Sequence, residues 1–243
     1  LDPFCGTGTT VVEARRNGLV GVGMEANPFP HFAGTVKTSW ELDPALLLDA
    51  AQRIGADVRR TLLQQGIDDN NLFQAYDLLQ LRDLPADAKK LLIQNSISPV
   101  PLHKSLVLLD LLRQHEGEPY YCHALLAFGK ALVSSISNLR FGPEVGVGKL
   151  KQDIPVIPCW LAQVQRMAAD LRSVQGRAYP PAVVHLADAR EPSAVLAPQS
   201  VDAVITSPPY PNEKDYTRTT RLESVLLGFY DTKNELRSFK QGL

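Results

Sequence analysis

The chain has 243 residues, of which 44% are hydrophobic, so it can bury the core of one large domain or of a domain with an insertion. No apolar stretch approaches the roughly 20 residues of a membrane span, and the chain opens without a signal-peptide pattern, so a cytoplasmic location is the default expectation. The formal net charge of −1 gives no overall basic field, and any contact with nucleic acid would need a local patch.

The first 25 residues predict the opening of a doubly wound α/β sheet. A glycine-containing loop at 2–10 leads into a helix at 11–16, which Asn17-Gly18 ends. A short apolar strand follows at 19–24 and is closed by Glu25 and by the breaker Asn27-Pro28. Strand end, loop, helix and strand in this order are typical of a parallel sheet with covering helices.

The middle of the chain predicts a helical insertion. Apolar residues recur at helical spacing in 45–63, 102–112, 122–139 and 160–171, with short polar or proline-bearing breaks between them. Residues 140–151 combine three glycines and a proline with basic side chains. That composition indicates an extended loop close to a ligand, and it fits a flexible linker between helices equally well.

Two further strands are predicted after the insertion. The apolar run 182–187 ends at Asp188, and the run 201–206 predicts a buried strand that ends in Ser207-Pro208-Pro209-Tyr210. Consecutive prolines donate no backbone N–H and leave the Ser207 and Pro208 carbonyls free to accept hydrogen bonds. A planar ring with an exocyclic amine would suit this turn, since its face could stack on Tyr210.

The residues that follow the predicted strands suit a nucleoside ligand. Gly6 and Gly8 allow close approach to the backbone at a helix N-terminus, but the loop lacks the Lys-Ser/Thr pair of a nucleotide-binding P-loop. Glu25, at a strand end, could accept the hydroxyls of a ribose. Asp188, at the next strand end, could accept an amino group, although a plain turn aspartate is the structural alternative.

The glycine loop at 2–10 and the turn Ser207-Pro208-Pro209-Tyr210 together resemble motifs of the S-adenosylmethionine-dependent DNA amino-methyltransferases. The Ser-Pro-Pro-Tyr form resembles the cytosine-N4 branch in particular. The resemblance implies S-adenosylmethionine as cofactor and a flipped cytosine of DNA as substrate, with a cognate restriction endonuclease as a candidate partner. It implies catalytic roles for the turn residues Ser207, Pro208, Pro209 and Tyr210. The cofactor-binding residues that it implies are Asp2, Pro3, Phe4, Gly6, Thr7, Gly8, Thr9, Glu25 and Asp188.

Basic residues beside the turn and in the glycine-rich loop are candidates for contacts with nucleic acid. They are Lys214, Arg218, Arg221, Lys149 and Lys151. A solvated helix start explains the first three equally well. The five histidines and three cysteines have no metal-ligand spacing, so no metal site is expected.

The sequence therefore predicts an α/β fold, a Rossmann-like class I methyltransferase sheet with strand order 3-2-1-4. This sheet is expected to be partial, truncated at both ends, and interrupted by a long all-helical insertion. Residues 1–38 and 176–243 form the predicted core, and 39–175 form the insertion, a region that could contact the target. The predicted reaction is methylation of cytosine N4 in DNA. The alternatives are N6-adenine methylation in DNA, N2-guanine methylation in RNA, and a non-catalytic nucleic-acid-binding fragment of a methylase fold.

Overall fold

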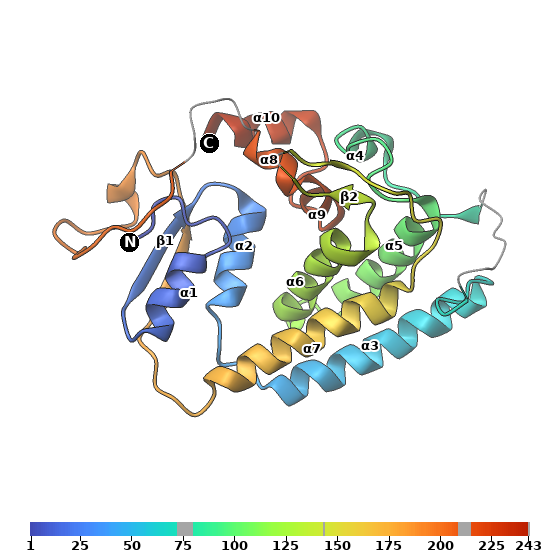
Figure 1. The fold of residues 1–243 in the computed structure, drawn as a ribbon, viewed down its shortest axis with the longest axis horizontal. Coiled ribbons are helices and arrows are strands. Elements are labelled where there is room, and N and C mark those ends of the chain that lie inside the picture. Colours follow the sequence, from blue (N-terminus) through green and yellow to red (C-terminus); the bar gives the residue numbers. More distant parts are fainter. Residues whose placement is uncertain (72–79, 143, 209–214, 243) are drawn as a thin grey trace. The chain divides into compact units, whose positions relative to one another are not determined.

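The computed structural model describes residues 1–71, 80–142, 144–208 and 215–242, and it shows a mixed α/β chain with a small parallel sheet (Figure 1). The chain divides into two compact units. The first, the sheet unit, contains Leu1–Glu41, Val174–Thr220 and Phe229–Leu243. The second, the helical unit, contains Leu42–Ser173 and Arg221–Gly228. Within the described ranges, no helix has both the length and the apolar character needed to cross a bilayer.

The sheet unit is built on two parallel strands. Strand β1 (Gly21–Glu25) pairs with β4 (Ala182–Leu186) from Gly21↔Ala182 to Glu25↔Leu186. Both strands were predicted, because each is a short apolar run ending at an acid or next to one. Their register places the carboxyl ends of the two strands side by side, which is where parallel α/β sheets bind ligands.

Two further segments, around Asp2 and around residues 203–205, continue the hydrogen-bonded pairing that starts from β1. Asp2 forms a parallel bridge with Gly23. The Leu1 ammonium donates to the Ala203 carbonyl (2.9 Å), and the Ile205 amide donates to the Leu1 carbonyl (3.0 Å). The segment around 203–205 therefore lies beside the first residues of the chain.

The prediction of a buried strand at 201–206 is wrong. This segment is not a regular strand, and Val204 and Ile205 are 58% and 67% exposed. Its two hydrogen bonds to Leu1 are too few for a ladder, and the described part of the chain leaves both side chains uncovered. An apolar run is buried only where a second layer covers it.

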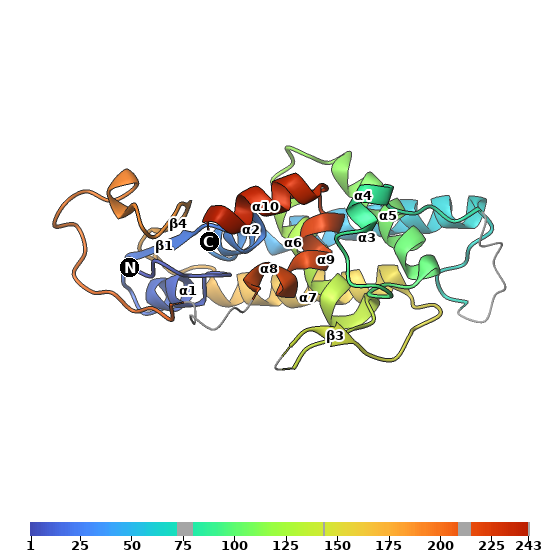
Figure 2. The ribbon, with the colours of Figure 1, turned by 90° about the horizontal axis from the view of Figure 1, so that it is seen from above.

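Two helices pack on the sheet. Helix α1 (Thr9–Arg16) contacts both strands, and α2 (Pro28–Lys37) does the same (Figures 1 and 2). Close packing of α1 requires glycine in β1, because a Cβ at Gly23 would lie 2.8 Å from Val11 Cγ2. Helix α2 was not predicted, since Asn27-Pro28 was interpreted as a breaker. Proline is favourable at the first helical position, and Pro28 occupies it.

The side chain of Arg15, a buried residue, ties together the two segments that connect the units. Its guanidinium donates to the Thr38 carbonyl and to the Pro180 carbonyl (3.0 Å), and it pairs with Glu41 (2.9 Å). It also lies 4.3 Å from the centre of the Trp40 ring. A single cation thus holds the outgoing segment at 38–41 beside the returning segment at 180.

The helical unit confirms the four predicted helical stretches. They are α3 (Pro44–Gln64), α5 (Pro99–Arg113), α6 (Tyr121–Ala131) and α7 (Val156–Val174). Its fully buried core includes Leu47, Ile54, Leu108, Leu112, Phe128 and Trp160. The shorter helices of the chain are α4 (Ala86–Lys89) and α9 (Arg221–Leu226) in this unit, and α8 (Tyr216–Thr219) in the sheet unit, where α10 (Lys233–Gly242) also lies.

The expectation of an all-helical insertion is corrected by a short hairpin. Helix α6 continues as the π-helix η2 (Leu132–Ile136), and strand β2 (Leu139–Arg140) then pairs antiparallel with β3 (Gly146–Val147). In Figure 2 this hairpin projects from the side of the helical unit. The predicted helix to residue 139 therefore ends at Ile136, where the chain turns into the hairpin.

Candidate functional site

The glycine loop and Glu25 are brought together at the carboxyl end of β1. The Asn27 amide donates to Glu25 Oε1 (2.7 Å), and the amides of Gly6 and Ala26 also form hydrogen bonds to this carboxylate. Burial raises the pKa of Glu25, and these three hydrogen bonds oppose the increase. The loop and the acid predicted to bind one ligand are thus in direct contact.

A hydrogen bond joins the glycine loop to the proline turn. Asp2 is buried, and its Oδ1 accepts from the Phe4 amide (3.1 Å) and from Thr206 Oγ1 (2.8 Å). Thr206 lies 204 positions along the chain from Asp2 and directly precedes Ser207. The two halves of the predicted site therefore meet in the structure.

The two loop glycines have different roles. Gly8 has a φ of +81°, and a Cβ there would lie 3.0 Å from the Gly34 Cα, so Gly8 lets α2 pack against the loop. Gly6 has a φ of +53°, and a Cβ there would meet no atom within 4 Å. The Gly6 backbone therefore faces open space, and the exposed Phe4 ring (41%) belongs to the same loop.

Thr7 of the glycine loop forms a contact with Lys37 that the sequence did not indicate. Lys37 of α2 donates from Nζ to Thr7 Oγ1 (2.8 Å) and to the Thr7 carbonyl (3.0 Å). Pro3 is half-buried, and Thr9 is exposed at the start of α1. A lysine 30 residues from the loop carries no local signal, so its role in holding Thr7 depends on the tertiary fold.

Asp188 lies next to Glu25 but is already paired. The Ala187 amide donates to the Glu25 carbonyl (3.1 Å), which places Asp188 beside the end of β1. Arg190 Nε contacts both Asp188 carboxylate oxygens (2.9 Å each), and hydrogen bonds from Arg190 lower the pKa of Asp188 to about 2. Asp188 is therefore fully ionised at neutral pH. Arg190 was missed, although the Asp-Ala-Arg spacing could have indicated the pair.

Asn27 is a second residue that the sequence reasoning missed. Its side chain is 4% exposed, and its Nδ2 donates to Thr220 Oγ1 (3.5 Å). Its Oδ1 accepts no hydrogen bond from the described residues. A buried acceptor without a donor costs free energy unless a ligand or water supplies one. An unused acceptor two residues from Glu25 fits a ligand that carries hydroxyl or amino groups.

Cys5 is a packing residue rather than a nucleophile. It is buried against Gly23, and burial together with the charges of Glu25 and Asp2 raises the pKa of its thiol to about 12. The thiolate is therefore negligible at neutral pH, in agreement with the prediction that Cys5 fills space. Among the described side chains, no group of three or more His, Cys, Asp or Glu could hold a metal ion.

The proline turn is described only in part. Ser207 and Pro208 are exposed and follow Thr206 directly, while Pro209, Tyr210 and Lys214 lie outside the described residues. Downstream, Arg218 is exposed on α8 in the sheet unit. Arg221 is half-buried, and its Nη1 donates to the Leu91 carbonyl (3.5 Å) within the helical unit.

The two lysines of the glycine-rich segment differ. Lys149 is exposed, whereas Lys151 Nζ donates to the carbonyls of Ser135 (2.5 Å) and Ser137 (2.6 Å). Lys151 therefore satisfies carbonyls at the end of η2. Because its ammonium is used inside the protein, the structure favours a structural role for Lys151 over the predicted contact with nucleic acid.

Comparison with known proteins supports the resemblance drawn from the two motifs. The chain is 28% identical over 258 aligned residues to the type II methyltransferase M.BsoBI of Geobacillus stearothermophilus. The match covers 98% of this chain and 48% of the relative, so the chain spans about half the length of the curated relative that it matches. No family model and no solved structure matches the chain. The similarity to a methyltransferase thus extends well beyond the motifs, over nearly the whole chain.

Proposed function

We propose that this chain carries the cofactor site and the amine-holding turn of an S-adenosylmethionine-dependent DNA methyltransferase that modifies N4 of cytosine. The hydrogen bond from Thr206 to Asp2 carries the proposal, because it brings the glycine loop to the residue before Ser207. The similarity to a type II methyltransferase supports methyl transfer as the reaction. The parallel pairing of β1 with β4 supports a Rossmann-like sheet.

The described residues fit the cofactor. Gly6 offers an open backbone, Glu25 offers a carboxylate for the ribose hydroxyls, and Asn27 offers an unused buried acceptor. In this proposal Asp2 and Thr7 shape the loop, and Asp188 receives the adenine amino group in competition with Arg190. When bound, S-adenosylmethionine supplies an electrophilic methyl group on a sulfonium.

The turn residues would hold the target amine. The amine of cytosine is a poor nucleophile because its lone pair conjugates with the ring. Hydrogen bonds to Ser207 and to the Pro208 carbonyl would favour a pyramidal nitrogen whose lone pair points toward the methyl group. Pro209 would stiffen the turn, and Tyr210 would stack on the flipped base. No covalent protein intermediate is needed, and the amine proton leaves after transfer.

Nucleoside mass spectrometry tests the choice of base. The chain would be incubated with isotopically labelled S-adenosylmethionine and with duplex DNA or structured RNA, and the nucleosides would be separated after digestion. N4-methylcytosine from DNA is the expected product. N6-methyladenine alone would overturn the cytosine assignment, and N2-methylguanine from RNA alone would overturn DNA as the substrate.

The alternative function is that of a non-catalytic scaffold that binds nucleic acid without transferring a methyl group. Calorimetric titration with S-adenosylmethionine separates the two, since the scaffold predicts no heat of binding and the proposal predicts saturable binding. Ser207→Ala serves as the matched variant. It should retain cofactor binding and lose methyl transfer, because Ser207 is assigned to the amine and not to the cofactor.

A further inference from the structure

The hairpin β2–β3 of the helical unit is anchored by several buried polar contacts. Asn138 directly precedes β2, where the chain enters the hairpin, and it is 2% exposed. Its Nδ2 donates to the Asn95 carbonyl (2.9 Å) and to Ser98 Oγ (3.0 Å), and its amide donates to the Ser96 carbonyl (2.7 Å). Its Oδ1 accepts from the Lys151 amide (2.8 Å), which ties the entry to the exit. The base of the hairpin is thus closed by one asparagine.

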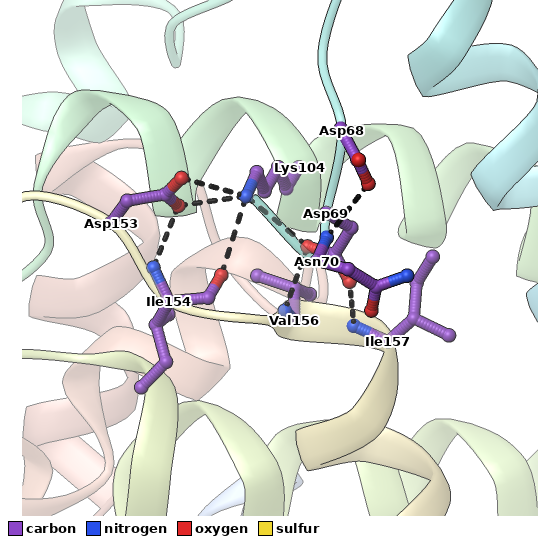
Figure 3. Close-up of polar contacts among 8 residues, drawn as sticks. All are labelled: Asp68, Asp69, Asn70, Lys104, Asp153, Ile154, Val156 and Ile157. Carbon is purple, nitrogen blue, oxygen red and sulfur yellow. Dashed lines mark hydrogen bonds and ion pairs between the residues drawn. The ribbon is translucent and has the colours of Figure 1, made fainter. Parts of the chain in front are cut away.

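Buried charged side chains hold the segment 153–157, through which the chain leaves the hairpin (Figure 3). Lys104 has a fully buried side chain and donates to both carboxylate oxygens of Asp153 (2.8 and 2.9 Å). It also lies 3.3 Å from the buried Asp69 carboxylate. Asp69 in turn accepts from the Val156 and Ile157 amides (3.0 and 2.9 Å) at the start of α7. Burial of charges is costly unless they are paired, so this cluster fixes where the chain leaves the hairpin.

The hairpin presents an exposed aromatic ring next to Arg140, and Lys149 lies nearer its base. Phe141 is 50% exposed, and Arg140 and Lys149 are exposed on the two sides of the hairpin. Neither cation has a side-chain hydrogen bond or ion pair with a residue that the structure describes. Arg140 lies opposite Gly146, and a Cβ at Gly148 would lie 3.5 Å from the Arg140 Cβ. Glycines facing Arg140 thus leave its side chain unobstructed.

We propose that this hairpin, anchored at its base, contacts DNA: Arg140 and Lys149 bind phosphates, and Phe141 packs as a wedge against the base stack. Exposed cations on both sides of the hairpin are complementary to a phosphate backbone, and an aromatic wedge between base steps is a known mode of groove binding. An anchored base lowers the entropy that the hairpin would lose on binding. The inference rests on the proposed function, since it takes duplex DNA as the partner.

The test measures binding of the 243-residue chain to duplex DNA over a range of salt concentrations. Each phosphate contact contributes about 0.9 to the slope of log K against log salt, so Arg140→Ala/Lys149→Ala should lower the slope by about 1.8. The control is Arg166→Ala/Arg172→Ala, which removes two exposed cations from α7 in the same unit. An unchanged slope in the hairpin variant, or an equal decrease in the control, would overturn the inference.

The wedge is tested separately. Phe141→Ala should weaken binding roughly 5- to 100-fold, the range expected for a lost base–aromatic contact, without changing the salt slope. Leu63→Ala, which removes an exposed apolar side chain of α3, should leave the affinity unchanged. Circular dichroism of every variant verifies folding. Unchanged affinity of Phe141→Ala would exclude the wedge.

Failure of the two proposals can be told apart, because the binding measurement needs no methyl transfer. Methylation of DNA with normal DNA affinity in all hairpin variants would overturn the hairpin inference and keep the enzyme. DNA binding that depends on the hairpin, without any transfer, would keep the inference and overturn the enzyme. A chain that binds no duplex at any salt concentration would overturn the inference.

Discussion

Glu25 is a partly buried carboxylate, and three backbone donors offset part of the cost that burial places on its charge. Glu25→Gln should weaken binding of S-adenosylmethionine about 10- to 100-fold, since hydrogen bonds to a charged group contribute roughly 1.5–3 kcal/mol. Titration calorimetry measures the change. Glu13→Gln, which alters an exposed acid of α1 in the same unit, should bind as the unaltered chain does.

The pH dependence of cofactor binding gives a second test at Glu25. Burial raises the pKa of this carboxyl, so the charged acceptor is lost at a higher pH than for an ordinary glutamate. Affinity should therefore fall as the pH decreases through the raised pKa, and Glu25→Gln should remove that dependence. The same decline in the variant would assign it to another group.

Glu223 of α9 affects stability rather than binding. It is 5% exposed, its Oε2 accepts no hydrogen bond from the described residues, and burial raises its pKa from 4.5 to about 7. The folded chain binds this proton more tightly than the unfolded chain. The free energy of unfolding should therefore fall between about pH 4.5 and pH 7, by roughly 3 kcal/mol, and stay level above that range.

Glu223→Gln should abolish this loss and make the chain more stable at pH 8, provided the amide occupies the same site. Urea unfolding at pH 5 and pH 8 measures the difference. The exposed Glu116→Gln is the matched change, and its effect should be within about 0.5 kcal/mol at both pH values. Equal pH dependence in the Glu223 variant and in the unaltered chain would contradict the assignment.

At the scale of elements, Arg15 links α1 to both connecting segments. Arg15→Lys keeps the charge but cannot reach the carbonyls of Thr38 and Pro180 together with Glu41. The free energy of unfolding should fall by about 2–3 kcal/mol, the cost of leaving buried acceptors unpaired. Arg16→Lys, which alters only an exposed pair with Glu13, should have an effect within about 0.5 kcal/mol. Urea unfolding compares the two, and equal losses would exclude the special role of Arg15.

The elements that could be predicted carry their signals locally. The strands β1 and β4 are apolar runs that end at or next to acids, and α3, α5 and α7 show helical spacing of apolar residues over 11 or more positions. The missed α2 and the overestimated segment 201–206 depend on context. Proline starts a helix or breaks one according to its position, and an apolar run does not show whether anything covers it.

The candidate site was predictable to a similar extent. The acids Glu25 and Asp188 follow strands, so their proximity could be inferred from parallel pairing. Lys37 and Asn27 could not be found, since their contacts join segments that are distant in sequence or depend on a buried geometry. Inclusion of Arg221–Gly228 in the helical unit is likewise a tertiary feature with no local signal.

At the scale of the whole molecule, the described residues of the proposed cofactor site all belong to the sheet unit. Hydrogen exchange with and without S-adenosylmethionine should therefore show added protection in residues 1–38 and 182–208. The helices α3, α5 and α6 should keep their exchange rates. Equal added protection throughout both units would contradict a site confined to the sheet unit. Protection only in the helical unit would move the cofactor site there.

Arg15 has a consequence for how freely the length of this protein could vary in evolution. Because its guanidinium holds residues 38–41 beside residue 180, the long segment between them leaves and re-enters the sheet unit at one place. The entropy of closing such an excursion grows slowly, by about 0.6 kcal/mol for each doubling of its length. Segments of very different size could therefore be exchanged between these two points at little cost, while the residues around Glu25 keep their positions.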